Sequence, residues 1–148
     1  MAGGAVRAPT IARAALWITA ASAAGVGLVA AFAPRTFYDD FPYVRHWVDR
    51  LPPYNEHLVT DVGALYLGFA LVLAWAAATL RRELVHAACA GWILFSVLHF
   101  VFHARNLDGF GTGDAVQELV SLAVVIALPL IALWAARPVT RTAPHAGA

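Results

Sequence analysis

The sequence predicts an all-α, polytopic membrane protein whose four transmembrane helices form one antiparallel bundle. Two observations predict this fold class. The chain of 148 residues is 61% hydrophobic and 13% charged, whereas soluble domains are roughly 45–50% apolar and about 25% charged. Four apolar stretches, approximately residues 14–33, 57–80, 84–103 and 115–136, reach the length of roughly 20 residues that spans a ~30 Å hydrocarbon core. The remaining segments are short, so we expect a single integral membrane domain over residues 1–148.

The first apolar stretch shares some features with a secretory signal peptide. Arg7 and Arg13 precede it, and it ends in Ala-Phe-Ala at residues 31–33, which is typical of a cleavage site. However, signal peptides have apolar cores of about 7–15 residues, and Pro34 would follow the cleavage site directly. We therefore expect this stretch to remain as the first transmembrane helix.

The distribution of arginine predicts the orientation in the membrane. With four spans, the N-terminus, the connection between the second and third spans, and the C-terminal tail lie on one side. That side carries Arg7, Arg13, Arg81, Arg82, Arg137 and Arg141, and the other side carries Arg35, Arg45, Arg50 and Arg105. Basic residues favour the cytoplasm, so we expect cytoplasmic N- and C-termini. The chain has no lysine and is rich in Ala, Gly and Arg, which is typical of GC-rich bacteria. We expect the chain to lie in the bacterial inner (plasma) membrane.

An aromatic and acidic loop separates the first two spans. Residues 34–54 combine Phe, Tyr and Trp with three aspartates, and aromatic side chains with polar tips prefer the headgroup region of a bilayer. We expect this loop to lie along the outer interface, with a short amphipathic helix near residues 44–51. Asn55 is then the predicted N-cap of the second span.

Three pairs of ionisable residues, each four positions apart, border the apolar spans. They are His57 with Asp61, His99 with His103, and Asp114 with Glu118. A helix places residues i and i+4 on one face, and ionisable groups at a membrane are costly unless they face protein, water or one another. All three pairs are expected at the outer ends of the helices. Asp114 with Gln117 predicts a capping box, whereas Asp61 and Glu118 lie one turn deeper.

If the outer helix ends converge, one pocket could hold His57, Asp61, His99, His103 and Glu118. One chemistry for such a pocket is metal or haem binding. His99 and His103 offer two nitrogens from one helix, and carboxylates from neighbouring helices could complete a metal site. A haem could instead use His57 and one of the other two histidines.

A second chemistry is acid–base catalysis on a lipophilic substrate that enters from the bilayer, as in an isomerase, a cyclase or a quinone-modifying enzyme. Asp61 and Glu118 would be the proton donor and acceptor, with His57 or His99 assisting. Ion or proton transport fits less well, because hydroxyls and one thiol are the only polar groups between the outer cluster and His86.

The remaining interpretation requires no chemistry. The ionisable pairs would satisfy one another, tie the helix ends together and hold the loop through Arg35, Arg45 or Arg105. The protein would then be a small accessory or assembly subunit whose surroundings are the lipid bilayer and a membrane-protein partner or a second copy. A net charge of +1 without a basic patch gives no reason to expect nucleic acid.

Two segments carry a family resemblance. Residues 37–42 (Phe-Tyr-Asp-Asp-Phe-Pro) and residues 54–63, which begin Tyr-Asn-Glu-His, together with four short spans, resemble small four-helix bacterial membrane proteins of the DoxX-like kind. They are most similar to an uncharacterised group among them, without established catalytic residues. The resemblance therefore implies a fold and a location rather than an activity.

Overall fold

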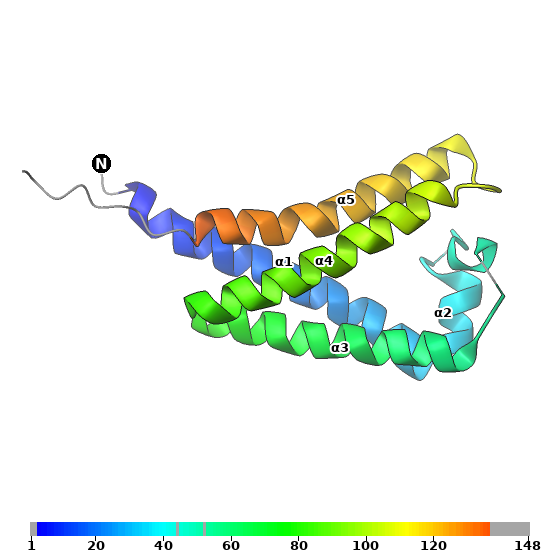
Figure 1. Cartoon of the computed structure of the whole chain (residues 1–148), viewed down its shortest axis with the longest axis horizontal. Helices are drawn as coiled ribbons and strands as arrows, with labels where there is room; N and C mark the ends of the chain where they lie inside the picture. The colour runs from blue at the N-terminus through cyan, green and yellow to red at the C-terminus, as the bar shows by residue number, and fades with distance from the viewer. Residues whose placement is uncertain (1–2, 44, 52, 137–148) are drawn as a thin grey trace, which may run out of the picture.

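The computed structural model describes residues 3–43, 45–51 and 53–136, with side chains from residue 8 onward. It is all-helical over these residues (Figure 1). The elements are α1 (Gly3–Phe32), α2 (Pro34–Asp40), a 3-10 turn η1 (Val48–Arg50), α3 (Glu56–Thr79), α4 (Arg82–Arg105) and α5 (Thr112–Ala135). The all-α fold class expected from the sequence is confirmed.

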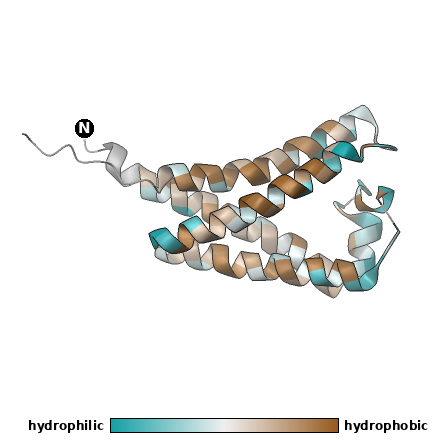
Figure 2. Cartoon of the chain, in the orientation of Figure 1, coloured by the Kyte–Doolittle hydropathy of each residue, from teal (hydrophilic) through white to brown (hydrophobic). Residues whose placement is uncertain are grey.

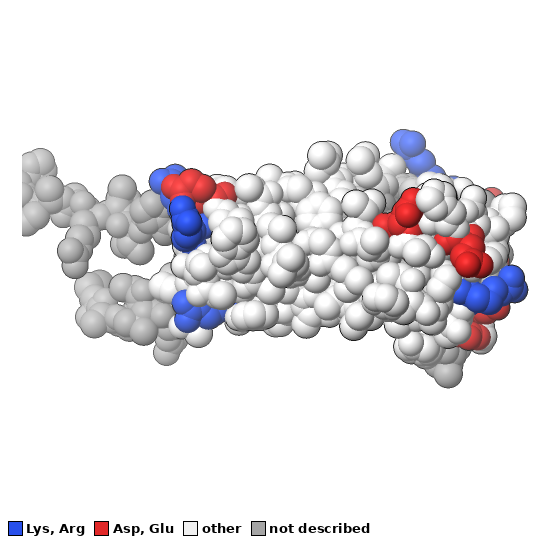
Figure 3. Space-filling view, turned by 90° about the horizontal axis from the view of Figure 1, so that it is seen from below, with Lys and Arg blue, Asp and Glu red and all other residues white. Residues whose placement is uncertain are grey.

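Four of these helices are long and apolar enough to cross a membrane: residues Ala8–Phe32 of α1, and all of α3, α4 and α5. Only 22% to 39% of the most apolar stretch of each is buried inside the bundle, so most apolar side chains point outward. Charged side chains gather at the two ends and leave an uncharged band between them (Figure 3). The helical segments between the two ends consist largely of hydrophobic residues (Figure 2). Such a surface suits lipid, and the protein is a membrane protein.

Small residues form most of the bundle interior. Among the described residues sixteen apolar side chains are buried, and eleven of them are alanines from α1, α3, α4 and α5. The other five are Leu16, Leu73, Val85, Cys89 and Trp92. Small side chains let helices approach closely where lipid supplies no hydrophobic force between them. The closest approach joins α1 to α3. A Cβ added at Gly63 would meet the backbone of Ala30 and Ala31, and one added at Gly27 would lie 3.0 Å from the carbonyl oxygen of Gly63.

The two ends of the bundle differ in shape. At one end, which we call the hairpin end, Thr79 of α3 and Arg82 of α4 are separated by two residues, and Leu80 makes the reversal in the left-handed conformation with φ 50°. Toward the other end, α3 and α4 diverge, and α2 with its following loop stands between them (Figure 1). We call this the α2 end; it contains the first turns of α3 and α5.

The loop and the helix starts partly follow the sequence predictions. Asn55 caps α3 as predicted, because its Oδ1 accepts a hydrogen bond of 3.1 Å from the backbone N–H of Leu58. The amphipathic helix expected near residues 44–51 is reduced to the single turn η1, and the longer helix α2 forms upstream instead. Pro34 explains this shift, since proline at the first helical position fixes a helical φ where no N–H partner is needed. Val44 lies outside the described residues.

Candidate functional site

The most buried ionisable pair joins α4 to α5 near the α2 end. His103 Nδ1 lies 2.6 Å from Glu118 Oε1, and the two side chains are only 10% and 4% exposed. The helices are antiparallel neighbours, which brings the end of α4 beside the start of α5. At this distance the imidazole and the carboxyl group form an acid–base pair. The two atoms are nevertheless not aligned for an Nδ1–H···O hydrogen bond.

The other oxygen of this carboxylate has no partner. Glu118 Oε2 and, on α4, Ser96 Oγ are buried and without a hydrogen-bond partner among the described residues. Unpaired buried polar atoms are rare because each loses its hydration without compensation. The pair therefore keeps unused acceptor capacity inside the bundle.

A row of rings leads from the middle of the bundle to His103. Along α4, Trp92 contacts Phe95, Phe95 stacks on His99 with centroids 5.5 Å apart, and His99 meets His103 edge-on at 4.5 Å. Tyr66 of α3 packs edge-to-face on both Trp92 and Phe95. These spacings of three and four residues place the row on one side of α4, so His99 is held by ring packing rather than by a charged partner.

His57 and Asp61 form the second pair, in a different environment. His57 Nε2 lies 3.3 Å from Asp61 Oδ2, and the side chains are 87% and 57% exposed on the outward face of α3. The helices α3 and α5, both described in full, make no contact with each other. The structure thus brings His99, His103 and Glu118 together and leaves His57 and Asp61 apart from them.

Asp114 binds the loop rather than capping its helix. Helix α5 begins at Thr112 with Gly111 as N-cap and no side-chain cap, so the predicted capping box with Gln117 does not form. The Asp114 carboxylate instead accepts from Arg45 at 3.1 Å and from Arg50 at 3.3 Å. The carboxylate binds these two arginines rather than the backbone N–H groups at the start of α5, because hydrogen bonds between two charged groups are stronger than those with a neutral donor.

The other end of the loop is held by arginine and tyrosine. Arg35 donates to Asp39 at 2.6 Å and lies 5.0 Å from the ring centre of Tyr54. Tyr54 in turn donates to Glu56 at 3.3 Å. Desolvation raises the pKa of the Tyr54 phenol, and the Glu56 carboxylate raises it further. The loop is therefore fastened both to the start of α3 and to the start of α5.

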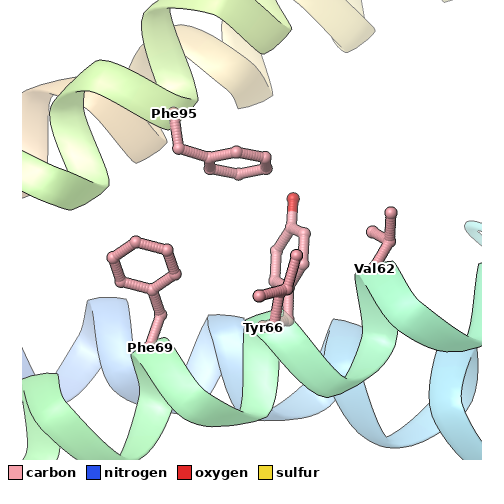
Figure 4. A pocket seen from close by; sticks show the side chains of 5 residues that line it. Val62, Tyr66, Phe69 and Phe95 are labelled. Carbon is pink, nitrogen blue, oxygen red and sulfur yellow. The ribbon is translucent and has the colours of Figure 1, made fainter.

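A small cavity lies between α3 and α4. It measures about 60 Å³ and is lined by Val62, Leu65, Tyr66, Phe69 and Phe95. The Tyr66 hydroxyl points from α3 toward α4, beside the ring of Phe95 (Figure 4). Pockets for small-molecule ligands usually measure about 300–1,000 Å³, so the cavity as it stands does not hold a lipophilic substrate.

The arrangement also bears on metal and haem binding. Within the described ranges, no group of three or more His, Cys, Asp or Glu side chains is placed to hold a metal ion, whereas protein zinc sites use three or four ligands. A haem shared between helices would need His57 to face α4, but His57 lies on the outward face of α3 beside Asp61. His99 and His103 are therefore better described as parts of the ring row.

Comparison with known proteins adds no relative: no family model, curated protein or solved structure matches the chain. Sequence reasoning missed Arg50, because no sequence signal marks it as the second partner of Asp114. Ser96 lies seven residues before His103, and this spacing places both residues on one face of α4, as expected.

Proposed function

We propose that this chain is a small accessory or assembly subunit of the bacterial inner membrane, with cytoplasmic N- and C-termini. Its partner is a transmembrane helix of another membrane protein, which binds the outward face of α3. One observation carries the proposal: the His57–Asp61 pair lies on the outward surface of a spanning helix. The arginine distribution and the DoxX-like layout support the location.

The depth of Asp61 makes its exposure costly in lipid. Helix α3 has 24 residues and is about 36 Å long, compared with a hydrocarbon core of ~30 Å. Asp61 is the sixth residue of the helix, so it lies near the edge of the core rather than in bulk water. Ionisable residues at this depth almost always face protein or a wet cavity, and a partner helix would supply that environment.

The rest of the same face suits a close helix contact. Continuing along α3 at steps of three and four residues, the exposed positions after Asp61 are Ala64, Gly68 and Leu71. A Cβ added at Gly68 meets no atom within 4 Å, so the small-residue segment is uncovered. Small residues four apart let a second helix approach closely.

The catalytic alternative has less support. Acid–base catalysis was expected to use Asp61 and Glu118 together, but these residues belong to helices that do not contact each other. What remains for that hypothesis is the His103–Glu118 pair with its unpartnered oxygen. The small cavity between α3 and α4 is lined by other residues than this pair.

Site-specific photo-cross-linking in cells tests the proposal. Leu71 on the proposed face and Leu94 on α4 are similarly exposed, at 71% and 65%, so p-benzoylphenylalanine at Leu94 is a matched control. We expect a discrete protein adduct from position 71, lost in the Asp61→Ala background, and none from position 94. Equal adducts from both positions, or an adduct from position 71 that persists without Asp61, would contradict the proposal. An adduct of twice the chain's mass would show that the partner is a second copy of this chain, and it would contradict the proposal that the partner is a different membrane protein.

A further inference from the structure

A separate hollow opens at the hairpin end of the bundle, at the opposite end from His103 and Glu118. Its volume is about 330 Å³, and its lining comprises Trp75, Arg81, Glu83 and Leu84. The two-residue reversal at Leu80 creates it, because Trp75 comes from the last turns of α3 whereas Glu83 and Leu84 belong to the first turn of α4. The volume falls within the range of small-molecule sites.

Two side chains of opposite charge line this hollow. Arg81 and Glu83 are both exposed, and in the described part of the chain neither forms a salt bridge, with the other or with any third residue. The start of α4 adds to the positive side, since the N-cap residue Arg81 makes no side-chain capping hydrogen bond. Uncapped N–H groups at a helix start favour an anion. The hollow thus offers one anion-binding side and one cation-binding carboxylate.

The hollow also lies where a bilayer has its headgroups. The charged groups at this end border the uncharged band of the surface (Figure 3), and Trp75 is 56% exposed in the last turns of a spanning helix. Tryptophan at such a position typically sits at the headgroup level. A ligand of this hollow would therefore contact charges on one side and apolar side chains on the other.

We infer that the hollow binds a zwitterionic phospholipid with a primary ammonium, of the phosphatidylethanolamine class. The phosphate is placed at Arg81 and the start of α4, the ammonium at Glu83, and the upper acyl chains against Trp75 and Leu84. A primary ammonium has three N–H donors for the carboxylate, whereas the trimethylammonium of phosphatidylcholine has none. Phosphatidylglycerol lacks a cation and would leave Glu83 facing an anionic lipid without a partner.

Native mass spectrometry of the purified full chain tests the inference. The chain is mixed with equimolar phosphatidylethanolamine, phosphatidylcholine and phosphatidylglycerol that have identical acyl chains. We expect the wild type to retain phosphatidylethanolamine over phosphatidylcholine by about threefold or more, the scale of an exposed ion pair. Glu83→Gln should abolish that preference while retaining lipid. Arg81→Gln should lower the retention of all three lipids.

Controls separate the site from general charge and from soluble headgroups. Arg105→Gln and Asp108→Asn change exposed charges near the α2 end and should keep the wild-type preference. Glycerophosphoethanolamine, which has no acyl chains, should not displace the lipid even in large excess, because it cannot contact Trp75 and Leu84. Three results would each overturn the assignment. They are equal retention of the three lipids by the wild type, an undiminished preference in a folded Glu83→Gln variant, and displacement of the lipid by the soluble headgroup. Thermal unfolding by circular dichroism verifies that each variant is folded.

Discussion

The indole Nε1 of Trp92 donates a 3.3 Å hydrogen bond to the carbonyl oxygen of Val125 on the neighbouring helix. Val125 is four residues before Pro129, which lies inside α5. Proline has no backbone N–H, so the carbonyl of Val125 loses its usual partner within the helix. Trp92, 1% exposed, replaces that partner from α4. The proline and the tryptophan are thus one structural unit across the α4–α5 contact.

Substitution of Trp92 should reveal this dependence on Pro129. Trp92→Phe keeps a buried ring but leaves the Val125 carbonyl without a donor, and we expect it to lower the free energy of unfolding by about 1–3 kcal/mol. In the Pro129→Ala background the helix regains its own N–H donor, so the same substitution should cost clearly less. Denaturant titration in detergent micelles measures all four proteins of this cycle. Equal costs in the two backgrounds would show that the hydrogen bond and the proline are independent.

The contact of α1 with α3 makes Gly63 intolerant of any side chain. In Gly63→Ala the new Cβ would lie 2.7 Å from the carbonyl carbon of Ala30 and would also meet the backbone of Ala31. Backbone atoms cannot rotate away, so we expect a loss of about 2–3 kcal/mol or more. Gly68→Ala on the same helix is the control, because its Cβ meets nothing within 4 Å; it should leave stability unchanged or slightly higher. Thermal unfolding of the two variants compares them directly, and similar losses would contradict the close α1–α3 contact.

The His103–Glu118 pair should respond differently to single and double substitution. Glu118→Ala leaves His103 buried without its acid partner, and we expect a loss of about 3 kcal/mol. Replacing both residues by leucine removes both polar groups and should restore much of the stability. Asp61→Asn on the exposed pair is the control and should have little effect. Retention of wild-type stability by Glu118→Ala would instead favour a catalytic role for the pair.

Asp114 should control the mobility of the loop. Asp114→Asn weakens the contacts with Arg45 and Arg50, which are partly exposed, so the cost in global stability should stay below about 1 kcal/mol. We expect amide hydrogen exchange to increase in residues 45–51 and to increase similarly in the wild type at high salt, because screening weakens exposed ion pairs. Asp108→Asn, which removes another charge near the same helix end, should leave exchange at the wild-type rate. Unchanged exchange in Asp114→Asn would show that other contacts hold the loop.

The proposed orientation has a direct test with reporter fusions. Fusions after residue 82 and after residue 148 should both report the cytoplasm, whereas a fusion after residue 108 should report the periplasm, as the arginine distribution predicts. A periplasmic signal from residue 82 or 148 would reverse or break the proposed topology.

The positions of the helices could be predicted closely from the sequence. The expected span 57–80 is α3 at Glu56–Thr79, and the expected span 115–136 is α5 at Thr112–Ala135. Length and apolar composition suffice for this because a bilayer fixes both. The first helix begins at Gly3, well before the expected start of the span at residue 14, and it includes Pro9. Apolar composition does not mark this extension, because residues outside an apolar segment can also be helical.

The assembly of the site could be predicted only in part. The i, i+4 rule correctly paired His57 with Asp61 and His99 with His103. It could not show which pairs face each other across helices. In a soluble bundle the apolar face marks the interior, but in lipid both faces of a helix are apolar. The arrangement instead depends on close contacts such as that at Gly63, which turn α3 so that Asp61 points outward.

The equal length of the last three helices constrains the membrane in which the protein resides. Each of α3, α4 and α5 has 24 residues, and two residues join α3 to α4. Neither helix of that hairpin can slide or tilt by itself to suit a thinner bilayer, so hydrophobic mismatch would act on the bundle as a whole. A thinner bilayer would have to deform around the protein, and the protein would therefore partition toward membrane regions whose thickness matches its own.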